Sequence, residues 1–307
     1  MIFRNKNNEI RSGFKIIAFS FIYLIFVSTF TGAIGGLVGG YISARYNSSL
    51  NYNDISELVQ NYMQNSSQGL LISQVLSILA LFITLFIVLK LFQKRKFEDI
   101  GLNSIKKNSK NLFYGMIFGA ISIIVISVVL MITGNIKFQN SFRNPQFNKN
   151  TLIGIFLFIL VAINEETLCR GYIFTTLNQM DKPWLSAVMS SAFFAALHLL
   201  NPNVNLIGIL NIFLVGMLFC FMYVRTKSLW MPIGFHFTWN YFQGNVFGFP
   251  VSGISEISGI YNIAYLKENI LTGGFFGPEA GIIATIVLIL NFILLNKRKK
   301  RVNKGRL

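Results

Sequence analysis

The sequence has few charged residues, few acidic residues and almost no cysteine. Only 12% of its 307 residues are Asp, Glu, Lys or Arg, and just 11 are acidic. Its two cysteines, Cys169 and Cys220, both lie in apolar segments, where disulfide-rich extracellular frameworks are not found. This scarcity excludes a disulfide-stapled secreted domain, and we expect both thiols to be reduced packing residues.

Hydrophobic residues are far more abundant than charged ones. They make up 53% of the chain, including 31 Phe, and they fall in long blocks rather than at strand or surface-helix periods. Blocks of about 20 apolar residues are long enough to cross a bilayer as helices. The sequence therefore predicts an all-α, polytopic integral membrane bundle with about eight transmembrane helices, at residues 14–42, 69–92, 112–133, 151–178, 185–200, 204–224, 229–246 and 275–296.

The basic residues are sorted between alternate loops. The net charge is +16, and 20 of the Lys and Arg residues lie in the termini and the loops on their side, against five in the opposite loops. Positive charge in short loops marks the cytoplasmic face, so both termini are predicted to be cytoplasmic. We expect the positive charge to face the lipid bilayer and not nucleic acid. The first apolar block is too long for a cleavable signal peptide and is expected to remain as an anchor.

The charge pattern also suggests how the chain is organised. Residues 1–150 are predicted to hold three transmembrane helices, an amphipathic segment on the outer surface and a basic cytoplasmic loop. Residues 151–296 would form the functional core, and 297–307 a basic cytoplasmic tail. No internal repeat divides the chain, so we expect these parts to act as one membrane domain.

Three charged residues follow directly on the apolar run 152–163. Glu165, Glu166 and Arg170 would each cost at least about 2.5–3.5 kcal/mol near a bilayer centre, so they are read as functional. Glu166 and Arg170 stand at i and i+4, where they share a helix face and neutralise one another. Glu165 is rotated by about 100° and lacks that partner. An ion-pair clamp explains two of the three charges and leaves Glu165 available for chemistry.

Both histidines of the chain lie in apolar segments. At 1.5 Å per residue, Glu165 and His198 are each roughly 20 Å from the predicted cytoplasmic face. His236 and Asn240 stand at i and i+4, and they lie roughly 10–16 Å in from the same face. The four side chains are therefore predicted to meet in one intramembrane site.

Three motifs in this order resemble the CPBP family of intramembrane proteases, the CAAX-prenyl-protease and bacteriocin-processing enzymes also called the Abi family. They are E-E-x-x-x-R (Glu165, Glu166, Arg170), F-x-x-x-H (Phe194, His198) and H-x-x-x-N (His236, Asn240). The segments 248–253 and 271–279 also look like a loop of bacterial members. The resemblance implies an endopeptidase of the bacterial plasma membrane that cleaves a peptide or a membrane-associated protein.

The resemblance also implies a role for each motif residue. Glu165 would activate water with the help of His198, while His236 and Asn240 would stabilise the oxyanion. Glu166 and Arg170 would form the structural pair, supported by Phe194. A zinc ion held by Glu165, His198 and His236 is chemically reasonable, but no H-E-x-x-H pair is present, and a metal-free enzyme without cofactors is favoured.

Two other classes of function remain open. A relative without catalytic activity could bind a peptide, confer immunity to a bacteriocin or act as a scaffold in the membrane. A proton-coupled transporter could also use intramembrane Glu and His residues, although the missing repeat counts against it.

Overall fold

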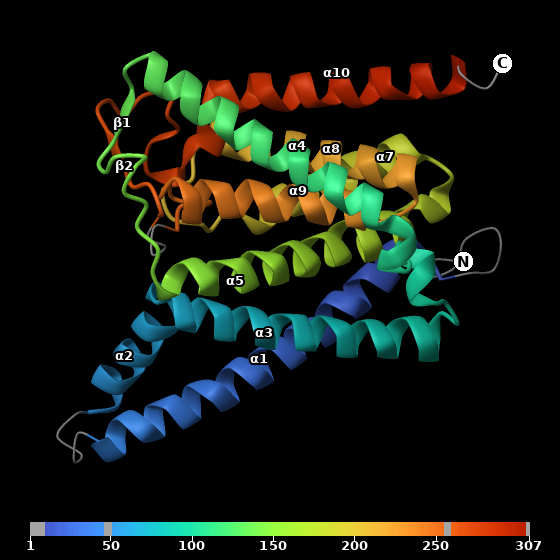
Figure 1. Cartoon of the computed structure of the whole chain (residues 1–307). Coiled ribbons are helices and arrows are strands. Elements are labelled where there is room, and N and C mark those ends of the chain that lie inside the picture. Colours follow the sequence, from blue (N-terminus) through green and yellow to red (C-terminus); the bar gives the residue numbers. More distant parts are fainter. Residues whose placement is uncertain (1–9, 46–50, 255–258, 305–307) are drawn as a thin grey trace.

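The computed structural model describes residues 10–45, 51–254 and 259–304, with side chains up to residue 297. Helices dominate these ranges, and a two-stranded antiparallel ribbon of β1 and β2 is the only sheet within them. The all-α polytopic bundle predicted from the hydrophobic blocks is confirmed (Figure 1). The α-helices and strands are α1 (Ser12–Arg45), α2 (Tyr52–Asn65), α3 (Ser67–Leu85), α4 (Ile105–Ile132), β1 (Ile136–Phe138), α5 (Lys149–Glu166), α6 (Thr175–Leu177), α7 (Pro183–Leu197), α8 (Leu206–Thr226), α9 (Trp230–Tyr241), β2 (Ile263–Tyr265) and α10 (Ile282–Lys304).

Several helices are extended by tighter or wider turns. Wider π-helical turns continue α3 as η1 (Phe86–Phe92), α5 as η3 (Thr167–Phe174) and α9 as η5 (Phe242–Val246). Short 3₁₀ turns form η2 (Phe97–Ile100), η4 (Asn178–Met180), η6 (Gly274–Phe276) and η7 (Pro278–Ala280).

Five helical segments of the described chain are long and apolar enough to cross a membrane. They are Ser12–Arg45, Ser67–Phe92, Phe97–Ile132, Lys149–Met180 and Leu206–Thr226. Two shorter apolar helices, Pro183–Leu197 and Ile282–Lys297, accompany them. The protein is thus an integral membrane protein. Three of the predicted spans, 185–200, 229–246 and 275–296, correspond to shorter apolar stretches in α7, α9 and α10.

Helix α9, which carries His236 and Asn240, packs closely against α4 along a line of glycines. A Cβ atom at Gly119 would lie 2.3 Å from the Phe235 carbonyl oxygen, and one at Gly115 would lie 2.1 Å from the Met231 carbonyl oxygen. Small residues spaced by four positions let two helices approach closely in lipid. This contact fixes the position of α9 relative to the rest of the bundle.

The segment before α10 differs from the sequence prediction. Residues 275–296 were predicted as one transmembrane helix, but α10 begins at Ile282 and the preceding residues form η6 and η7. Gly277 has φ +118, and a Cβ there would lie 2.3 Å from the Pro250 carbonyl oxygen. Because this conformation favours glycine and Pro278 follows it, a continuous helix is interrupted here. The second of these turns, η7, contributes Glu279 to a pocket wall.

The bundle surrounds the site from several directions. In Figure 1, α5 and α9 run side by side through its middle, with α3 below them and α4 above. Helix α7 packs on α8 and on η3, the π-helical continuation of α5. At one end, β1 pairs with β2, with Ile136 opposite Tyr265, and joins the loops that follow α4 and α9. Residues far apart in sequence therefore converge between α5, α7 and α9.

Candidate active site

Glu165 and Glu166 are the last two residues of α5 before its hydrogen-bonding pattern widens into η3. Single π-helical turns inside α-helices are frequent at functional sites. Glu166 is fully buried, and its Oε1 atom lies 2.9 Å from Nη1 of Arg170, which is also fully buried. Glu165 turns in another direction, and its side chain keeps 25% exposure. The two consecutive carboxylates therefore have different environments.

Aromatic rings surround the Arg170 guanidinium. Its central carbon lies 4.2 Å from the centroid of the Phe194 ring and 5.1 Å from that of Phe219. A Cβ atom on Gly216 would lie 3.0 Å from Nη2, so this glycine makes room for the cation. Attraction between a desolvated cation and ring faces adds to the ion pair with Glu166.

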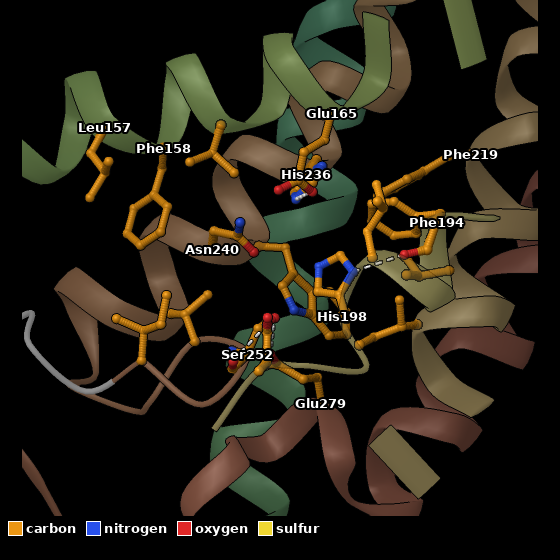
Figure 2. Close-up of a pocket in the computed structure, with 18 of the residues that line it drawn as sticks. Leu157, Phe158, Glu165, Phe194, His198, Phe219, His236, Asn240, Ser252 and Glu279 are labelled. Atoms are coloured by element: carbon orange, nitrogen blue, oxygen red, sulfur yellow. Dashed lines mark hydrogen bonds and ion pairs between the residues drawn. The ribbon is translucent and has the colours of Figure 1, made fainter. Parts of the chain in front are cut away.

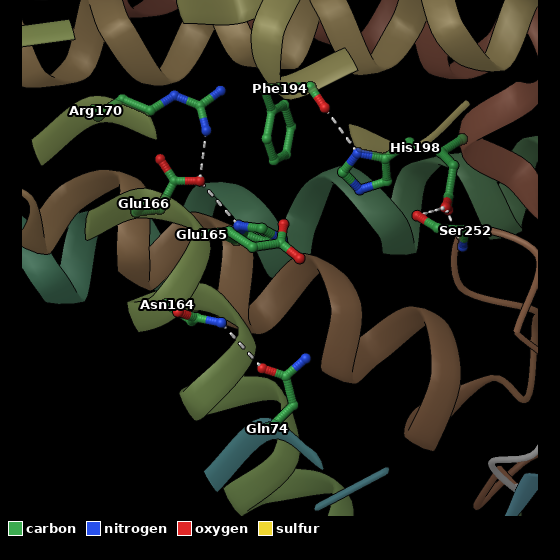
Figure 3. Close-up of polar contacts among 10 residues, drawn as sticks. Gln74, Asn164, Glu165, Glu166, Arg170, Phe194, His198 and Ser252 are labelled. Carbon is green, nitrogen blue, oxygen red and sulfur yellow. Dashed lines mark hydrogen bonds and ion pairs between the residues drawn. The ribbon is translucent and has the colours of Figure 1, made fainter. Parts of the chain in front are cut away.

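His236 contacts both carboxylates through opposite ring nitrogens. Its Nδ1 atom lies 3.0 Å from Oε1 of Glu166, and its Nε2 atom lies 3.8 Å from Oε2 of Glu165. Figure 3 shows the two carboxylates, with a dashed line between Glu166 and Arg170. An ionised carboxylate only accepts hydrogen bonds, so Nδ1 carries the hydrogen and donates it to Glu166. The imidazole also stacks on Phe219, with ring centroids 5.5 Å apart. Nε2 is consequently directed toward Glu165 and the pocket.

His198 stands at the C-terminal end of α7, one residue after Leu197. Its Nδ1 atom lies 2.9 Å from the backbone carbonyl oxygen of Phe194. A carbonyl accepts and cannot donate, so Nδ1 holds the hydrogen and Nε2 of the neutral ring is an acceptor. The Phe194 ring lies edge-on to the His198 ring, with centroids 4.8 Å apart. Phe194 thus orients His198 and covers Arg170.

One pocket of about 290 Å³ joins the predicted site residues. Glu165, His198, His236 and Asn240 all line it, together with mostly apolar side chains (Figure 2). The Asn240 side chain makes no hydrogen bond to any residue that the structure describes, so its amide is available to a ligand. The structure therefore brings together the four residues named from the motifs, while Glu166 and Arg170 lie behind them.

Several polar residues near the site had not been singled out from the sequence. Asn164 donates to Ser77 Oγ at 2.9 Å and to Gln74 Oε1 at 3.4 Å, which joins α5 to α3. Gln74 also lines the pocket, so the predicted N-terminal part of the chain contributes to it. The polar Asn164 inside an apolar run was the only signal of this contact.

Ser252 and Glu279 line the same pocket at its other end. They come from the segments 248–253 and 271–279, which look like a loop of bacterial members of the family that the motifs resemble. Nothing in the spacing of those segments indicates that their side chains reach the site.

A metal site is not evident in this geometry. Among the described residues, no three His, Cys, Asp or Glu side chains are grouped closely enough to hold a metal ion. The set Glu165, His198 and His236, which would be the ligands of a zinc ion, does not form such a group. Glu166 is already engaged by Arg170 and His236.

The fold and the site define an integral membrane helical bundle that encloses a pocket with a carboxylate, two imidazoles and an amide. Residues 147–242 match the Rce1-like family, described as type II CAAX prenyl endopeptidase Rce1-like. This range includes all three motifs, and the match confirms the resemblance to the CPBP family.

A curated relative also matches part of the chain. It is an uncharacterized 24.3 kDa protein of Escherichia coli, 26% identical over 134 residues, which are 41% of this chain. The chain spans about 61% of the length of that relative. No solved structure matches the chain.

Proposed function

We propose that the protein is an intramembrane endopeptidase that hydrolyses a peptide bond of a peptide or membrane-associated protein. The convergence of Glu165, His198, His236 and Asn240 on one largely apolar pocket carries this proposal. The match to a family of CAAX-type endopeptidases supports the same reaction. A base, an imidazole that positions water and hydrogen-bond donors for an oxyanion are what amide hydrolysis requires.

Glu165 is the general base in this scheme. Its carboxylate removes a proton from a water molecule that also donates a hydrogen bond to Nε2 of His198. The water oxygen forms a bond to the carbonyl carbon, and the electron pair of the carbonyl moves to oxygen. When the carbon–nitrogen bond breaks, the proton held by Glu165 passes to the leaving amine.

Asn240 and His236 stabilise the oxyanion of the tetrahedral intermediate. The Asn240 amide donates directly, whereas Nε2 of His236 donates only in the imidazolium form, because Nδ1 already donates to Glu166. Two carboxylates flank this ring, Glu166 at 3.0 Å from Nδ1 and Glu165 at 3.8 Å from Nε2. Losing one oxyanion donor typically costs on the order of 10²–10³ in rate.

The cellular setting is part of the proposal. The sorting of basic residues between the loops supports cytoplasmic termini in a bacterial plasma membrane. The substrate would then reach the pocket from the bilayer or from its surface, in keeping with the apolar lining. No cofactor takes part in the scheme.

Cleavage of a peptide panel by the purified full chain in detergent tests the function. We expect hydrolysis that is abolished by Glu165→Gln, preserved in Glu57→Gln, a matched change on the exposed surface of α2, and unaffected by a strong chelator. Cleavage by Glu165→Gln would refute the role of Glu165. Peptide binding without cleavage by the unmodified protein would instead support the peptide-binding scaffold.

Chelation provides the second arm of the same experiment. Loss of activity with chelator, restored by zinc but not by magnesium, would refute the metal-free scheme and identify a zinc enzyme.

A further inference from the structure

Glu279 is a second carboxylate of the pocket that the proposed reaction does not use. It lies in the short turn η7 before α10 and lines the pocket with Ser252. In Figure 2, His198 lies between the end of the pocket that holds Glu165 and the end that holds Ser252 and Glu279. The pocket therefore has an acidic group at each end.

The backbone around Glu279 is held firmly in place. The Asn211 amide on α8 donates to the carbonyl oxygens of Glu279 and Gly281, at 2.7 Å and 3.0 Å. Asn211 is oriented in turn by Thr285, which donates to its Oδ1 at 2.7 Å. The position of the carboxylate is thus set by α8 and α10 before any ligand arrives.

Every hydrogen-bond partner of the carboxylate among the described residues is a neutral group. Oε1 accepts from the backbone N–H of Ser252 and, at 3.0 Å, from its hydroxyl, while Oε2 accepts from the Gln243 amide. Glu166, in contrast, pairs with Arg170. Within the described part of the chain, no Lys or Arg lies within ion-pair distance of Glu279, and none lines the pocket.

Three neutral donors orient a carboxylate without cancelling its charge. Desolvation by burial accordingly raises the pKa of Glu279 to about 8, with the hydrogen bonds from Ser252 acting in the opposite direction. A cationic group next to Oε2 would offset the free-energy cost of burying the ionised carboxylate. No Lys or Arg among the described residues supplies such a cation, so a ligand would have to bring it.

The rest of the pocket fits the methylene stem of such a ligand. Its lining is largely apolar, and its volume of about 290 Å³ accommodates an extended basic side chain beside a peptide backbone. We propose that Glu279 and Ser252 form a binding subsite for an organic ammonium or guanidinium group, which selects peptide substrates with a basic residue or a free N-terminus near the cleaved bond. This substrate class rests on the proposed peptidase function.

Binding to the non-cleaving Glu165→Gln chain in detergent tests the subsite separately from catalysis. The probes are a leucine-rich peptide with capped ends and one central lysine, the same peptide with Nε-acetyl-lysine, and a lysine-free peptide with a free or an acetylated N-terminus. We expect acetylation of the preferred cation to weaken binding about tenfold or more, as for loss of a charge-assisted hydrogen bond. If the lysine and acetyl-lysine peptides differ, the subsite binds a lysine side chain; if the free and acetylated N-termini differ, it binds the N-terminal amine.

Variants of the subsite provide the controls. Glu279→Gln in the same background should reduce the discrimination to about twofold or less, because Gln keeps the shape but not the charge. Ser252→Ala removes one hydrogen bond that orients the carboxylate but leaves its charge, so it should reduce the discrimination less than Glu279→Gln does. If Glu279→Gln weakens binding of charged and acetylated peptides equally, Glu279 only supports the pocket wall, and the subsite is refuted.

If Glu279→Gln fails to fold, the comparison of charged and acetylated peptides on the chain that retains Glu279 still tests the proposal. Equal binding of charged and acetylated peptides, or no binding of either, overturns it. Cleavage without charge preference would refute the subsite alone, whereas charge-selective binding without cleavage would refute the peptidase function alone.

Discussion

Replacing Arg170 by Met should destabilise the protein strongly, because it leaves the Glu166 carboxylate buried without its cation. Glu166 is fully buried, and its Oε2 atom has no hydrogen-bond partner among the described residues, so Arg170 and His236 both contact the carboxylate through Oε1. Breaking a buried ion pair by removing one partner costs about 3–5 kcal/mol. The contacts of the guanidinium with Phe194 and Phe219 add about 0.5–2 kcal/mol each.

Thermal unfolding followed by tryptophan fluorescence in detergent measures this loss. At about 2–4 °C per kcal/mol, the ion-pair contribution alone predicts a Tm lower by roughly 6–20 °C. The double variant Glu166→Gln with Arg170→Met should be more stable than Arg170→Met alone, because no uncompensated charge remains. An Arg170→Met Tm within 2 °C of the unmodified protein, or a double variant less stable than both singles, would refute the reasoning.

Arg225 provides a matched control for the size of this effect. Its guanidinium also lies over a ring, 4.5 Å from the centroid of Phe221, and it contacts the Leu295 carbonyl oxygen. Arg225 is only partly buried and, among the residues that the structure describes, has no acidic partner that its removal would leave unpaired. Arg225→Met should therefore cost about 1 kcal/mol or less.

Three further predictions concern other parts of the structure. Gly119→Ala should lower both Tm and cleavage rate because its Cβ would lie 2.3 Å from a backbone oxygen of α9, whereas Gly32→Ala, with open space around it, should change neither. Asn164→Ala should cost about 1 kcal/mol and raise KM, because α3 loses its hydrogen bonds to α5. Glu279 keeps its proton in the folded state up to about pH 8 but loses it near pH 4.5 when unfolded. The free energy of unfolding should therefore fall by up to about 1.4 kcal/mol per pH unit as the pH rises from 4.5 to about 8. Glu279→Gln should flatten a plot of Tm against pH over the same range.

The helical fold follows from the sequence because a bilayer imposes one simple requirement. A chain in hydrocarbon must satisfy its backbone hydrogen bonds internally, so long apolar blocks become helices. The contact between Glu166 and Arg170 is equally local, since the helical period places i and i+4 on one face. The similar depth of Glu165 and His198 in the membrane could be predicted from the rise per residue and the expected ends of their two helices.

The rest of the site depends on contacts that local patterns do not encode. The change from α5 to the π-helical η3 has no residue signature, because both conformations accept the same side chains. His198 was expected inside a helix but stands at the end of α7, where Nδ1 reaches the Phe194 carbonyl. The apolar residues around Glu279 suggested a transmembrane helix, while its place in the pocket depends on Asn211 of α8 and on Ser252 in the segment that follows α9 and η5.

The geometry of His236 joins the structural and the chemical parts of the site. Consecutive residues of a helix point about 100° apart, so Glu165 and Glu166 cannot act on the same target from the same side. The imidazole of His236 contacts both carboxylates. Its Nδ1 atom is hydrogen-bonded to the buried Glu166, and its Nε2 atom faces Glu165 in the pocket. Glu166 therefore does more than neutralise Arg170, because it also selects which nitrogen of His236 faces the substrate. A change at Glu166 should alter the chemistry of the pocket even where the fold survives it.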